Sequence, residues 1–523
     1  MAPDTEQGLA IATCPSPSVH GAVRRSTGDI TWLIDNAEAF DTLIAACRSA
    51  RSSIWMTQLA FDADCVAYRA HDAAGVPDAQ PVRIADLLLE AAIARDVDVR
   101  ILLNASLLLD TAAPLRRYLA ANGGDATRIR VRGIRRFPQL LHAKIVVIDE
   151  QTAFLIGSPF ANGYWDDSQH APLDARRPAR ELGGRPLHDL SVRLDGDAVP
   201  TLALSFAELW NGADDVDSSD TVPLAVAAPP VADGATVRIV RSAPEARRAG
   251  HPLGRTEILG ALLAGIASAE RLIYIEHQYL SSIAVIGALA AALARQPALE
   301  LIIVLNQNPD VTAYRGWQNR RLSESGLLEH PRVGIFSLWT ADGASSGAVI
   351  NQVFMHSKVV TVDDRWALVG SANLDGVSLQ TYADDFSGRL GRRVFRGVRN
   401  FDVAAVVSSP AGRADDGAIA ELRVALWREH LDAPDLDGIT TPVGGWLADW
   451  RRRARENVQR LNDAGSSDAR SGIMLLEYSL SSTPARQLRD AGVDLANHAF
   501  DIGFDPSWIE VHLSPNWVRN IFA

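Results

Sequence analysis

The sequence lacks the features that mark three classes of protein. It has only three cysteines, Cys14, Cys47 and Cys65, and no CxxC pair, so neither a disulfide framework nor a cysteine-based zinc site is expected. Its start shows no basic segment followed by an apolar run, which a secretion signal would need. It also contains no apolar stretch of about 18 residues, the length that a membrane-spanning helix requires. We therefore expect a cytoplasmic protein.

The charge balance and the length set further limits. The chain has 523 residues, with 51 Lys and Arg against 63 Asp and Glu, which gives a formal net charge of 51 − 63 = −12. Non-specific nucleic-acid binding depends on Lys and Arg that neutralise phosphates, so nucleic acid is not an expected partner. A chain of this length exceeds what one hydrophobic core usually serves, which favours two domains or one duplicated unit.

An internal repeat is the strongest feature of the sequence. The segment LLHAKIVVIDEQTAFLIGSP begins at residue 140, and FMHSKVVTVDDRWALVGSAN begins at residue 354. Both read as His, a small residue, Lys, an apolar run, Asp, and a second apolar run that ends in Gly-Ser. With one offset of 356 − 142 = 214, three residues of the first copy match three of the second: His142, Lys144 and Asp149 correspond to His356, Lys358 and Asp363.

The repeat extends beyond this motif and predicts the fold. SARSSIWMTQLAFD (from residue 49) resembles SAERLIYIEHQYL (from 268), and VDVRILLN (from 97) resembles LELIIVLN (from 299). Short apolar runs alternate with helical patterns at 39–50 and 256–269, which predicts α/β lobes with mostly parallel sheets. We expect an N-terminal tail (1–27), a first lobe (28–213), a linker (214–236), a second lobe (237–432) and a C-terminal extension packed on the body (433–523).

The duplicated His-Lys pair predicts phosphodiester chemistry. In a strand, residues i and i+2 share a face, so His142 projects with Lys144 and His356 with Lys358. Two such units facing each other supply two ammonium groups to neutralise a phosphoryl group, one neutral His to attack phosphorus and one protonated His to protonate the leaving oxygen. This chemistry requires no metal and no cofactor. A single HxK is more typical of a structural His, but two buried Lys residues without a function would be costly.

The aspartates of the motif have a different expected role. Asp149 and Asp363 lie five residues after each Lys, with opposite strand parity, so they should face away from it. We expect them to hold the turn that follows the strand, and a direct part in the chemistry is the alternative.

These motifs resemble those of the phospholipase D superfamily, in which HxKxxxxD occurs twice, followed by Gly-Ser or Gly-Gly and by Asn. The resemblance covers both predicted lobes and implies two pseudo-symmetric α/β/α sandwiches with the active site between them. It implies a covalent phosphohistidine on His142, with His356 as general acid and base and with Lys144 and Lys358 binding phosphate. The supporting residues that it implies are Ser158, Ser371 and Asn373.

The first copy departs from the family pattern. Phe160 stands where the second copy has Asn373, so either Asn162 replaces that amide or Phe160 shapes this half for an apolar group. The family also supplies an acid that orients each His. The first half offers Asp189 in PLHDLSVRLDG, and the second half offers Asp384 or Asp385 in SLQTYADDF.

Further stretches indicate the substrate class. IYIEHQYL (from 273), GYWDD (from 163), GRPLHDLSVRLDG (from 184) and LRVALWREHL (from 422) resemble the lipid-acting branch of the family. We therefore expect a monomer that acts on phospholipid at a membrane surface, with water or an alcohol as acceptor. The alternatives are a phosphodiesterase or nuclease acting on nucleic acid or another small phosphodiester, and a catalytically idle phospholipid-binding scaffold. Two complete His-Lys pairs argue against an idle scaffold.

Two arginine-rich segments have two interpretations each. RIRVRGIRR, from Arg128, and RRRAR, from Arg451, could dock on anionic headgroups at the membrane surface. The favoured interpretation is a solvated, charged surface segment, such as an edge strand kept soluble by its charges.

Overall fold

The computed structural model describes most of both predicted lobes. The described residues are 30–68, 81–106, 109–124, 127–136, 139–177, 184–213, 220–223, 236–244, 254–310, 312–342, 348–380, 397–409, 417–433, 445–463, 472–495 and 500–502. The expected N-terminal tail (1–27) and almost all of the expected linker (214–236) lie outside these ranges. The domain boundaries therefore stay predictions.

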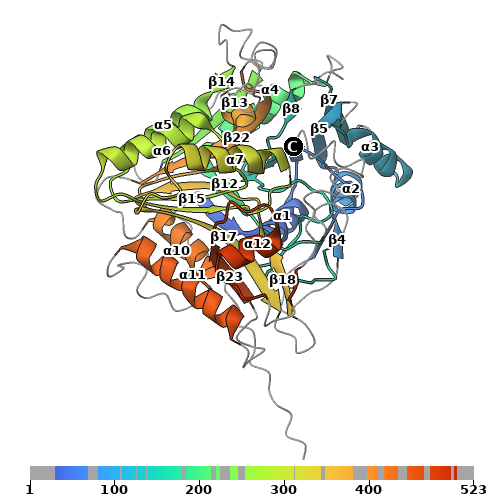
Figure 1. The fold of residues 1–523 in the computed structure, drawn as a ribbon. Helices are drawn as coiled ribbons and strands as arrows, with labels where there is room; N and C mark the ends of the chain where they lie inside the picture. Colours follow the sequence, from blue (N-terminus) through green and yellow to red (C-terminus); the bar gives the residue numbers. More distant parts are fainter. Residues whose placement is uncertain are drawn as a thin grey trace, which may run out of the picture.

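Two mixed β-sheets form the frame of the molecule (Figure 1). The first sheet consists of β1 (Ile30–Ile34), β12 (Leu190–Asp195), β10 (Thr152–Leu155), β9 (Ile145–Ile148), β2 (Ser53–Thr57), β5 (Asp98–Ser106) and β6 (Leu109–Asp110), with β7 (Ile129–Ile134) on β5. The second runs in the order β14 (Arg255–Thr256), β13 (Thr236–Ala243), β22 (Asn400–Ser408), β21 (Trp366–Gly370), β20 (Lys358–Val362), β15 (Leu272–His277), β16 (Glu300–Leu305), β17 (Val333–Asp342), β18 (Ala348–Gln352) and β24 (Phe500–Ile502). A small separate pair is formed by β3 (Val66–Tyr68) and β4 (Pro81–Arg83).

The two sheets repeat one strand order, as the sequence repeat predicts. The series β1-β12-β10-β9-β2-β5-β7 of the first sheet corresponds to β13-β22-β21-β20-β15-β16-β17 of the second. The expectation of mostly parallel sheets is wrong, because only β2-β5-β7 and β15-β16-β17 run parallel and the other neighbours in each series are antiparallel. The strands are apolar because helices cover them, and that covering acts alike on strands of either direction.

Helices cover the sheets and complete each lobe. The helices of the first lobe are α1 (Asp35–Ser49), α2 (Ile84–Arg95), α3 (Ala112–Ala121) and α4 (Val199–Asn211). Those of the second are α5 (Glu257–Ser268), α6 (Ile283–Arg295), α7 (Thr312–Glu324), the single turn α8 (Gly376–Leu379) and α10 (Ala418–His430). In Figure 1 the strands of the second sheet pass between α5 and α6 on one side and α10 and α11 (Trp446–Asn462) on the other.

The core clusters show how the lobes join. Side chains of α1, α2 and α3 pack on one face of the first sheet, and those of α5 and α6 pack on one face of the second. A third cluster mixes the lobes, since it places Ile145 and Val147 of β9 together with Val403 and Ala405 of β22. Apolar contact therefore continues across the boundary between the two lobes, which fixes their relative position.

The C-terminal segment adds to the second lobe. The strand β23 (Gly472–Glu477) pairs antiparallel with β17, and the helix α12 (Pro484–Asp490) follows it. On α11, Trp450 is fully buried and packs against Phe336 and Trp427. The described part of the expected extension thus packs on the body of the molecule.

The first arginine-rich segment forms β7, and its arginines pair with carboxylates. Arg130 lies 2.6 Å and Arg132 2.8 Å from the carboxylate of Asp220. Arg132 is only 5% exposed, and its guanidinium lies 4.3 Å from the centroid of the Trp210 ring. Both predicted interpretations are wrong for Arg132, because a buried, ion-paired arginine neither docks on headgroups nor solvates an edge.

The second arginine-rich segment lies on α11. There Arg451 donates to the carbonyls of Pro331 and Val333, and Arg453 donates to those of Leu431 and Asp432. These two arginines join α11 to the loops beside it.

Candidate active site

Both His-Lys pairs lie just before or at the start of a central strand. His142 falls between β8 (Leu140–Leu141) and β9, and His356 falls between β19 (Phe354–Met355) and β20. The prediction that each pair lies inside a strand is wrong by a few residues. Of the four His and Lys residues, only Lys358 belongs to a strand. Each lysine side chain turns back toward the backbone of the His in its own pair. Lys144 Nζ donates to the carbonyl of His142 at 3.1 Å, and Lys358 Nζ donates to that of His356.

The short strand before each His pairs with the other lobe. β8 runs parallel to β22, and the N–H of His142 donates to the carbonyl of Phe401 at 3.0 Å. In the mirrored arrangement, β11 (Leu187–His188) runs parallel to β19, and the N–H of His356 donates to the carbonyl of His188 at 2.8 Å. The backbone of each lobe thus holds the His-Lys segment of the other.

A buried asparagine braces each of these short strands from its own lobe. Asn104, at the end of VDVRILLN, exchanges two hydrogen bonds with the backbone of Leu141, at 2.8 and 2.9 Å. Asn306, one residue past LELIIVL, does the same with Met355, at 2.7 and 2.8 Å. The sequence repeat contains both asparagines, but spacing alone did not reveal their role.

The imidazole of His142 is oriented by the second lobe. Its Nδ1 lies 2.7 Å from Oδ1 of Asp402, and the same oxygen accepts a hydrogen bond from Ser371 Oγ at 2.8 Å. His142 is 2% exposed and Asp402 is 1% exposed. A buried carboxylate at Nδ1 fixes the ring and leaves Nε2 for chemistry.

The imidazole of His356 is oriented by the first lobe in the same way. Its Nδ1 lies 2.8 Å from Oδ2 of Asp189, which also accepts a hydrogen bond from Ser158 Oγ. The ring of Tyr164 packs edge-on against this imidazole, with 5.3 Å between the ring centroids. Each predicted Gly-Ser therefore serves the His of the opposite copy, and Asp189 lies where an orienting acid is needed.

The glycine before each serine is closely packed, Gly157 against the Asp189 carboxylate and Gly370 against the backbone of the strand that carries Asp402. A Cβ at Gly157 would lie 2.1 Å from Oδ1 of Asp189, and a Cβ at Gly370 would lie 2.4 Å from the carbonyl of Val403. Distances this short exclude a side chain, so glycine is required at both positions by close approach.

The electrostatics of the site suit an anion. Burial, together with repulsion from Lys144 and Lys358, lowers the pKa of His142 to about 4 against the attraction of Asp402. Burial and the same two ammonium groups lower the pKa of His356 to about 3. Because the Lys of each lobe acts on the His of the other, all four groups belong to one site.

The two lysines show the same effect. Burial and the charge of Lys358 lower the pKa of Lys144 to about 7, and burial lowers that of Lys358 to about 8. Burial would raise the pKa of Asp189, but its contacts with His356 and the charge of Lys358 lower it to about 2. The negative charge of a phosphate bound among these groups would offset the repulsion that the two ammonium groups cause. It would therefore favour the protonated forms of the histidines and lysines.

Asp149 and Asp363 lie at the other end of the strand from the histidines. Both occupy the turn after β9 or β20, with φ of 53° and 51°. The carboxylate of Asp149 accepts hydrogen bonds from the backbone N–H groups of residues 51 to 53, and that of Asp363 does so from residues 270 to 272. These contacts fit the expected role of holding the turn. None of them is made with a His or Lys of the candidate site.

The remaining predicted residues divide into two groups. Asn373 is 1% exposed, and its amide has no hydrogen-bond partner among the described residues, as an amide that receives a ligand would have. Asn162 instead donates to the carboxylates of Asp62 and Asp64, so the structure does not bring it to the His-Lys set. Phe160 is a core residue, wedged edge-on between two other phenylalanines, Phe40 and Phe61.

The acid beside His142 was missed from the sequence. Asp384 and Asp385, which the sequence offered as the orienting acid of the second half, lie outside the described residues, and the carboxylate of Asp402 contacts Nδ1 of His142. A signal was present: 402 − 189 = 213 equals the offset between Gly157 and Gly370. The segment around Asp402, NFDVAAVV, lacks the His that precedes Asp189, which hid the correspondence.

Comparisons with known proteins show which family this chain resembles. A family model described as "Cardiolipin synthase, PLD-like domain" matches residues 43–162 and 262–385, and each range contains one His-Lys pair. Phospholipase D B of Dictyostelium discoideum is 27% identical over 244 residues, which cover 38% of this chain and 19% of that protein. Cardiolipin synthase A of Pseudomonas aeruginosa is 28% identical over 240 residues, or 46% of this chain and 41% of that protein.

A solved structure shows the same fold. The crystal structure of phosphatidylserine synthase from Haemophilus influenzae superposes with a TM-score of 0.50 at 16% identity, over 77% of this chain and 87% of that one. The chain spans only about a fifth of the length of the curated phospholipases D that it matches first, 19% and 18%. Among the described residues, no helix has both the length and the apolar character needed to cross a bilayer.

Proposed function

We propose that this chain, as a two-repeat member of the phospholipase D superfamily, hydrolyses or transfers the phosphatidyl group of glycerophospholipids. The observation that carries this proposal is the crossed pair of His-Asp contacts, His142 with Asp402 and His356 with Asp189, beside two buried lysines. A carboxylate on Nδ1 prepares each Nε2 for nucleophilic or acid-base work.

The first step forms a phosphohistidine. Nε2 of His142 attacks phosphorus, and a P–N bond forms as the P–O bond to the headgroup alcohol breaks. His356, protonated at Nε2 once the anionic substrate is bound, gives its proton to the departing oxygen. Lys144 and Lys358 neutralise the charge that develops on the phosphoryl oxygens.

The second step releases the phosphatidyl group. Neutral His356 removes a proton from water or an alcohol, whose oxygen attacks phosphorus while the P–N bond breaks. Asp402 stabilises the positive charge that His142 carries during the intermediate. The acceptor decides the outcome, since water gives hydrolysis and an alcohol gives transfer.

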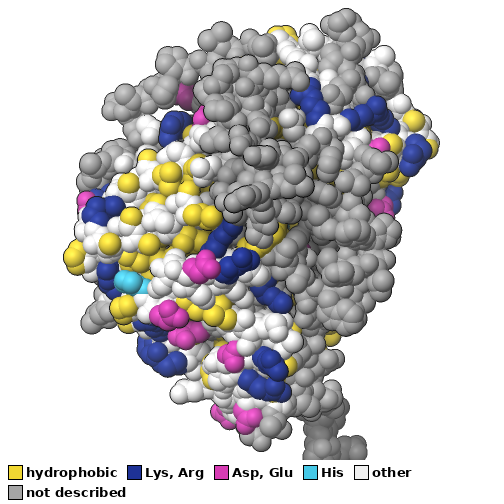
Figure 2. Space-filling view, turned by 45° about the horizontal axis from the view of Figure 1, so that its top comes forward, with side chains coloured by type: hydrophobic (Ala, Val, Ile, Leu, Met, Phe, Trp, Pro, Cys, Tyr) yellow, Lys and Arg dark blue, Asp and Glu magenta, His cyan; other side chains and the backbone are white. Residues whose placement is uncertain are grey.

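Three observations support a lipid over a nucleic-acid substrate. The relatives named above are lipid enzymes by name. The chain carries a net charge of −12. On the face shown in Figure 2, the described Lys and Arg side chains are spread among Asp and Glu side chains and do not gather into one broad patch of the kind that tracks a nucleic-acid backbone.

The test is release of choline, ethanolamine or glycerol from defined vesicles by the full chain, measured with a chelator in the assay buffer. We expect release that His142→Ala and His356→Ala each abolish. Cleavage of single-stranded or duplex DNA, with no release from any vesicle, would refute the lipid proposal and favour the nuclease alternative.

The order of the two histidines has a test of its own. With a lipid labelled in the phosphate, His356→Ala should accumulate a phosphoenzyme and His142→Ala should not. Accumulation in His142→Ala alone would exchange the two roles and leave the substrate class unaffected.

A further inference from the structure

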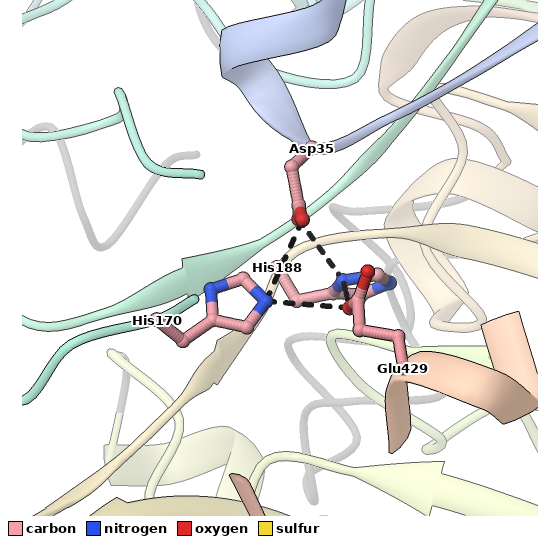
Figure 3. A group of neighbouring side chains, drawn as sticks. All are labelled: Asp35, His170, His188 and Glu429. Carbon is pink, nitrogen blue, oxygen red and sulfur yellow. Dashed lines mark hydrogen bonds and ion pairs between the residues drawn. The ribbon is translucent and has the colours of Figure 1, made fainter. Parts of the chain in front are cut away.

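A second group of buried titratable side chains lies beside the site and takes no part in the proposed mechanism. Asp35 at the start of α1, His170 in a loop, His188 on β11 and Glu429 on α10 point toward one another (Figure 3). One ligand-type atom from each lies within 4.8 Å of the others. Both imidazoles are fully buried, and the Glu429 side chain, 10% exposed, is the most open of the four.

The spacing of these atoms matches four ligands around one small ion. Nδ1 of His188 lies 2.7 Å from Oε1 of Glu429 and 3.0 Å from Oδ1 of Asp35. Nε2 of His170 lies 3.3 Å from that same Glu429 oxygen and 3.6 Å from Oδ2 of Asp35. Ligands at about 2.0–2.1 Å from a tetrahedral zinc ion are separated by about 3.3 Å, which falls inside this range.

Two polar atoms of this group lie near other polar atoms without forming a hydrogen bond to them. His188 Nδ1 and Asp35 Oδ2 have no hydrogen bond among the described residues, although both are buried and have polar atoms nearby. A buried polar atom without a partner is costly, so this geometry calls for another group. Lone pairs that converge on a common centre would explain why the contacts are short but not aligned as hydrogen bonds.

The other nitrogen of each imidazole is held as in metal sites. His170 Nδ1 lies 2.9 Å from Oδ2 of Asp166, and His188 Nε2 lies 3.3 Å from Oε1 of Glu276. Carboxylates in these positions take the N–H of the ring and turn the remaining lone pair toward an ion. Two neutral imidazoles, two carboxylates and a divalent cation also sum to zero charge, which favours burial.

We propose that Asp35, His170, His188 and Glu429 bind a divalent transition-metal ion, with zinc as the ion that best suits two imidazoles and two carboxylates in a closed tetrahedral set. All four ligands come from the protein, and three of them are buried while Glu429 is only 10% exposed, so the ion is structural. Three ligands belong to the first lobe and Glu429 to the second, and the ion therefore clamps the lobes together.

The clamp lies one residue from the candidate active site. His188 directly precedes Asp189, and its carbonyl accepts the backbone N–H of His356 at 2.8 Å. Fixing His188 therefore fixes two of the contacts that the first lobe makes with His356, the backbone hydrogen bond to His188 and the side-chain contact with Asp189. This role is separate from the phosphohistidine chemistry, which uses no atom of the ion.

The rival state is a metal-free ion-pair network. Burial opposes a charge on His170, but Asp35, Asp166 and Glu429 outweigh it and raise its pKa to about 10. Without an ion, both imidazoles would therefore hold protons and face the two carboxylates as cations. The two states differ in metal content, which is measurable without any activity.

The test is elemental analysis of the full chain, expressed without a polyhistidine tag and purified without chelator. We expect about one zinc per chain, and a loss of about tenfold or more in His170→Gln and Glu429→Gln. His330→Gln, which changes a histidine outside the group, should keep the wild-type zinc content. Cobalt-grown wild-type protein should show the visible absorption of tetrahedral Co²⁺, a readout that depends on no variant.

The contradicting results are equally clear. Folded wild-type protein that holds no stoichiometric transition metal, both as isolated and after incubation with zinc, would overturn the proposal in favour of the ion-pair network. Wild-type zinc content in a folded His170→Gln would also overturn it, whereas stoichiometric manganese or iron would confirm the metal site and overturn the choice of zinc. Vesicle assays report separately on the proposed function.

Discussion

Asp189 of the first lobe lies 2.8 Å from Nδ1 of His356 in the second, and Asp402 of the second lobe makes the matching contact, at 2.7 Å, with His142 of the first. The acid that orients each histidine thus comes from the opposite half of the chain. Ser158 and Ser371 extend the exchange, because each donates to the carboxylate of its own lobe.

This exchange predicts which step each aspartate controls. Asp402→Asn should impair His142 and so lower the rate of phosphoenzyme formation, whereas Asp189→Asn should impair His356, which acts in both steps, and so slow phosphoenzyme breakdown as well as formation. Loss of the carboxylate at Nδ1 should cost about 10³–10⁴-fold in kcat, since the ring loses its tautomer and orientation. Rapid-quench labelling of the enzyme measures both steps.

A matched control variant changes another aspartate on β12, the strand that begins directly after Asp189. Asp195→Asn, at the last residue of β12, removes a carboxylate that contacts Arg193 and Thr152. Its kcat should stay near the wild-type value. Phosphoenzyme breakdown at the wild-type rate in Asp189→Asn would contradict the assignment of Asp189 to His356.

A methyl group at residue 157 should damage the site. In Gly157→Ala the new Cβ would meet the Asp189 carboxylate, which is held by His356, by Ser158 and by the N–H of Leu190 at 2.8 Å. We expect a loss of about 1–3 kcal/mol in the free energy of unfolding and a lower kcat, because relief requires Asp189 to move.

The comparison variant for this change is Gly287→Ala on α6. A Cβ there meets nothing within 4 Å, so alanine should stabilise the helix by about 0.5–1 kcal/mol and leave kcat unchanged. Chemical unfolding and vesicle assays on the two variants measure both quantities. A fully active Gly157→Ala would show that the Asp189 contact tolerates displacement.

The buried lysines should make the free protein less stable at neutral pH. Burial lowers the pKa of Lys144 from 10.5 to about 7, so the unfolded chain binds more protons than the folded one between about pH 7 and 10.5. Stability should therefore rise with pH across that window. Lys144→Met removes the part of this dependence that Lys144 contributes, while that of Lys358 remains, and should stabilise by about 1–4 kcal/mol at pH 7.

The same variant should lose activity, by about 100-fold or more, because one of the two cations that neutralise the phosphoryl group is gone. Thermal unfolding from pH 6 to pH 10 gives the readout: the gain in Tm over wild type should be largest at the acid end and shrink toward pH 10. A gain that grows with pH would have the wrong sign for this explanation.

The motif aspartates should affect folding and not chemistry. Asp149→Ala leaves the N–H groups of residues 51 to 53 without their acceptor and places alanine at a φ of 53°, so about 2–3 kcal/mol of stability should be lost. Asp149→Asn keeps one acceptor oxygen and tolerates this φ, and it should recover part of the loss. If kcat per folded molecule drops in either variant, the alternative chemical role is correct.

The pattern of the sequence predicted the repeat, the two His-Lys pairs and the lobed α/β fold because these depend on local spacing. It did not predict strand direction, since an apolar run records only that a strand is covered on both faces. It also did not predict the position of Phe160, because alignment to Asn373 by the offset of 213 places it in the site, whereas packing against Phe40 and Phe61 draws it into the core.

Asp402 illustrates the limit of such reasoning. It lies 260 residues from His142 in the chain, and what joins the two is the docking of one lobe on the other. A contact of that kind leaves no periodic trace in either segment. The repeat offset of 213 was the one internal signal, and it points to Asp402 only after the role of Asp189 is known.

The exchange of acids between the lobes has a consequence for inheritance. A substitution that displaces Asp189 or Asp402 first affects the histidine in the other half of the chain. Neither half can therefore change in sequence independently of the other. Compensating changes should therefore pair positions across the two halves more often than within one. The two repeats should therefore evolve as one unit.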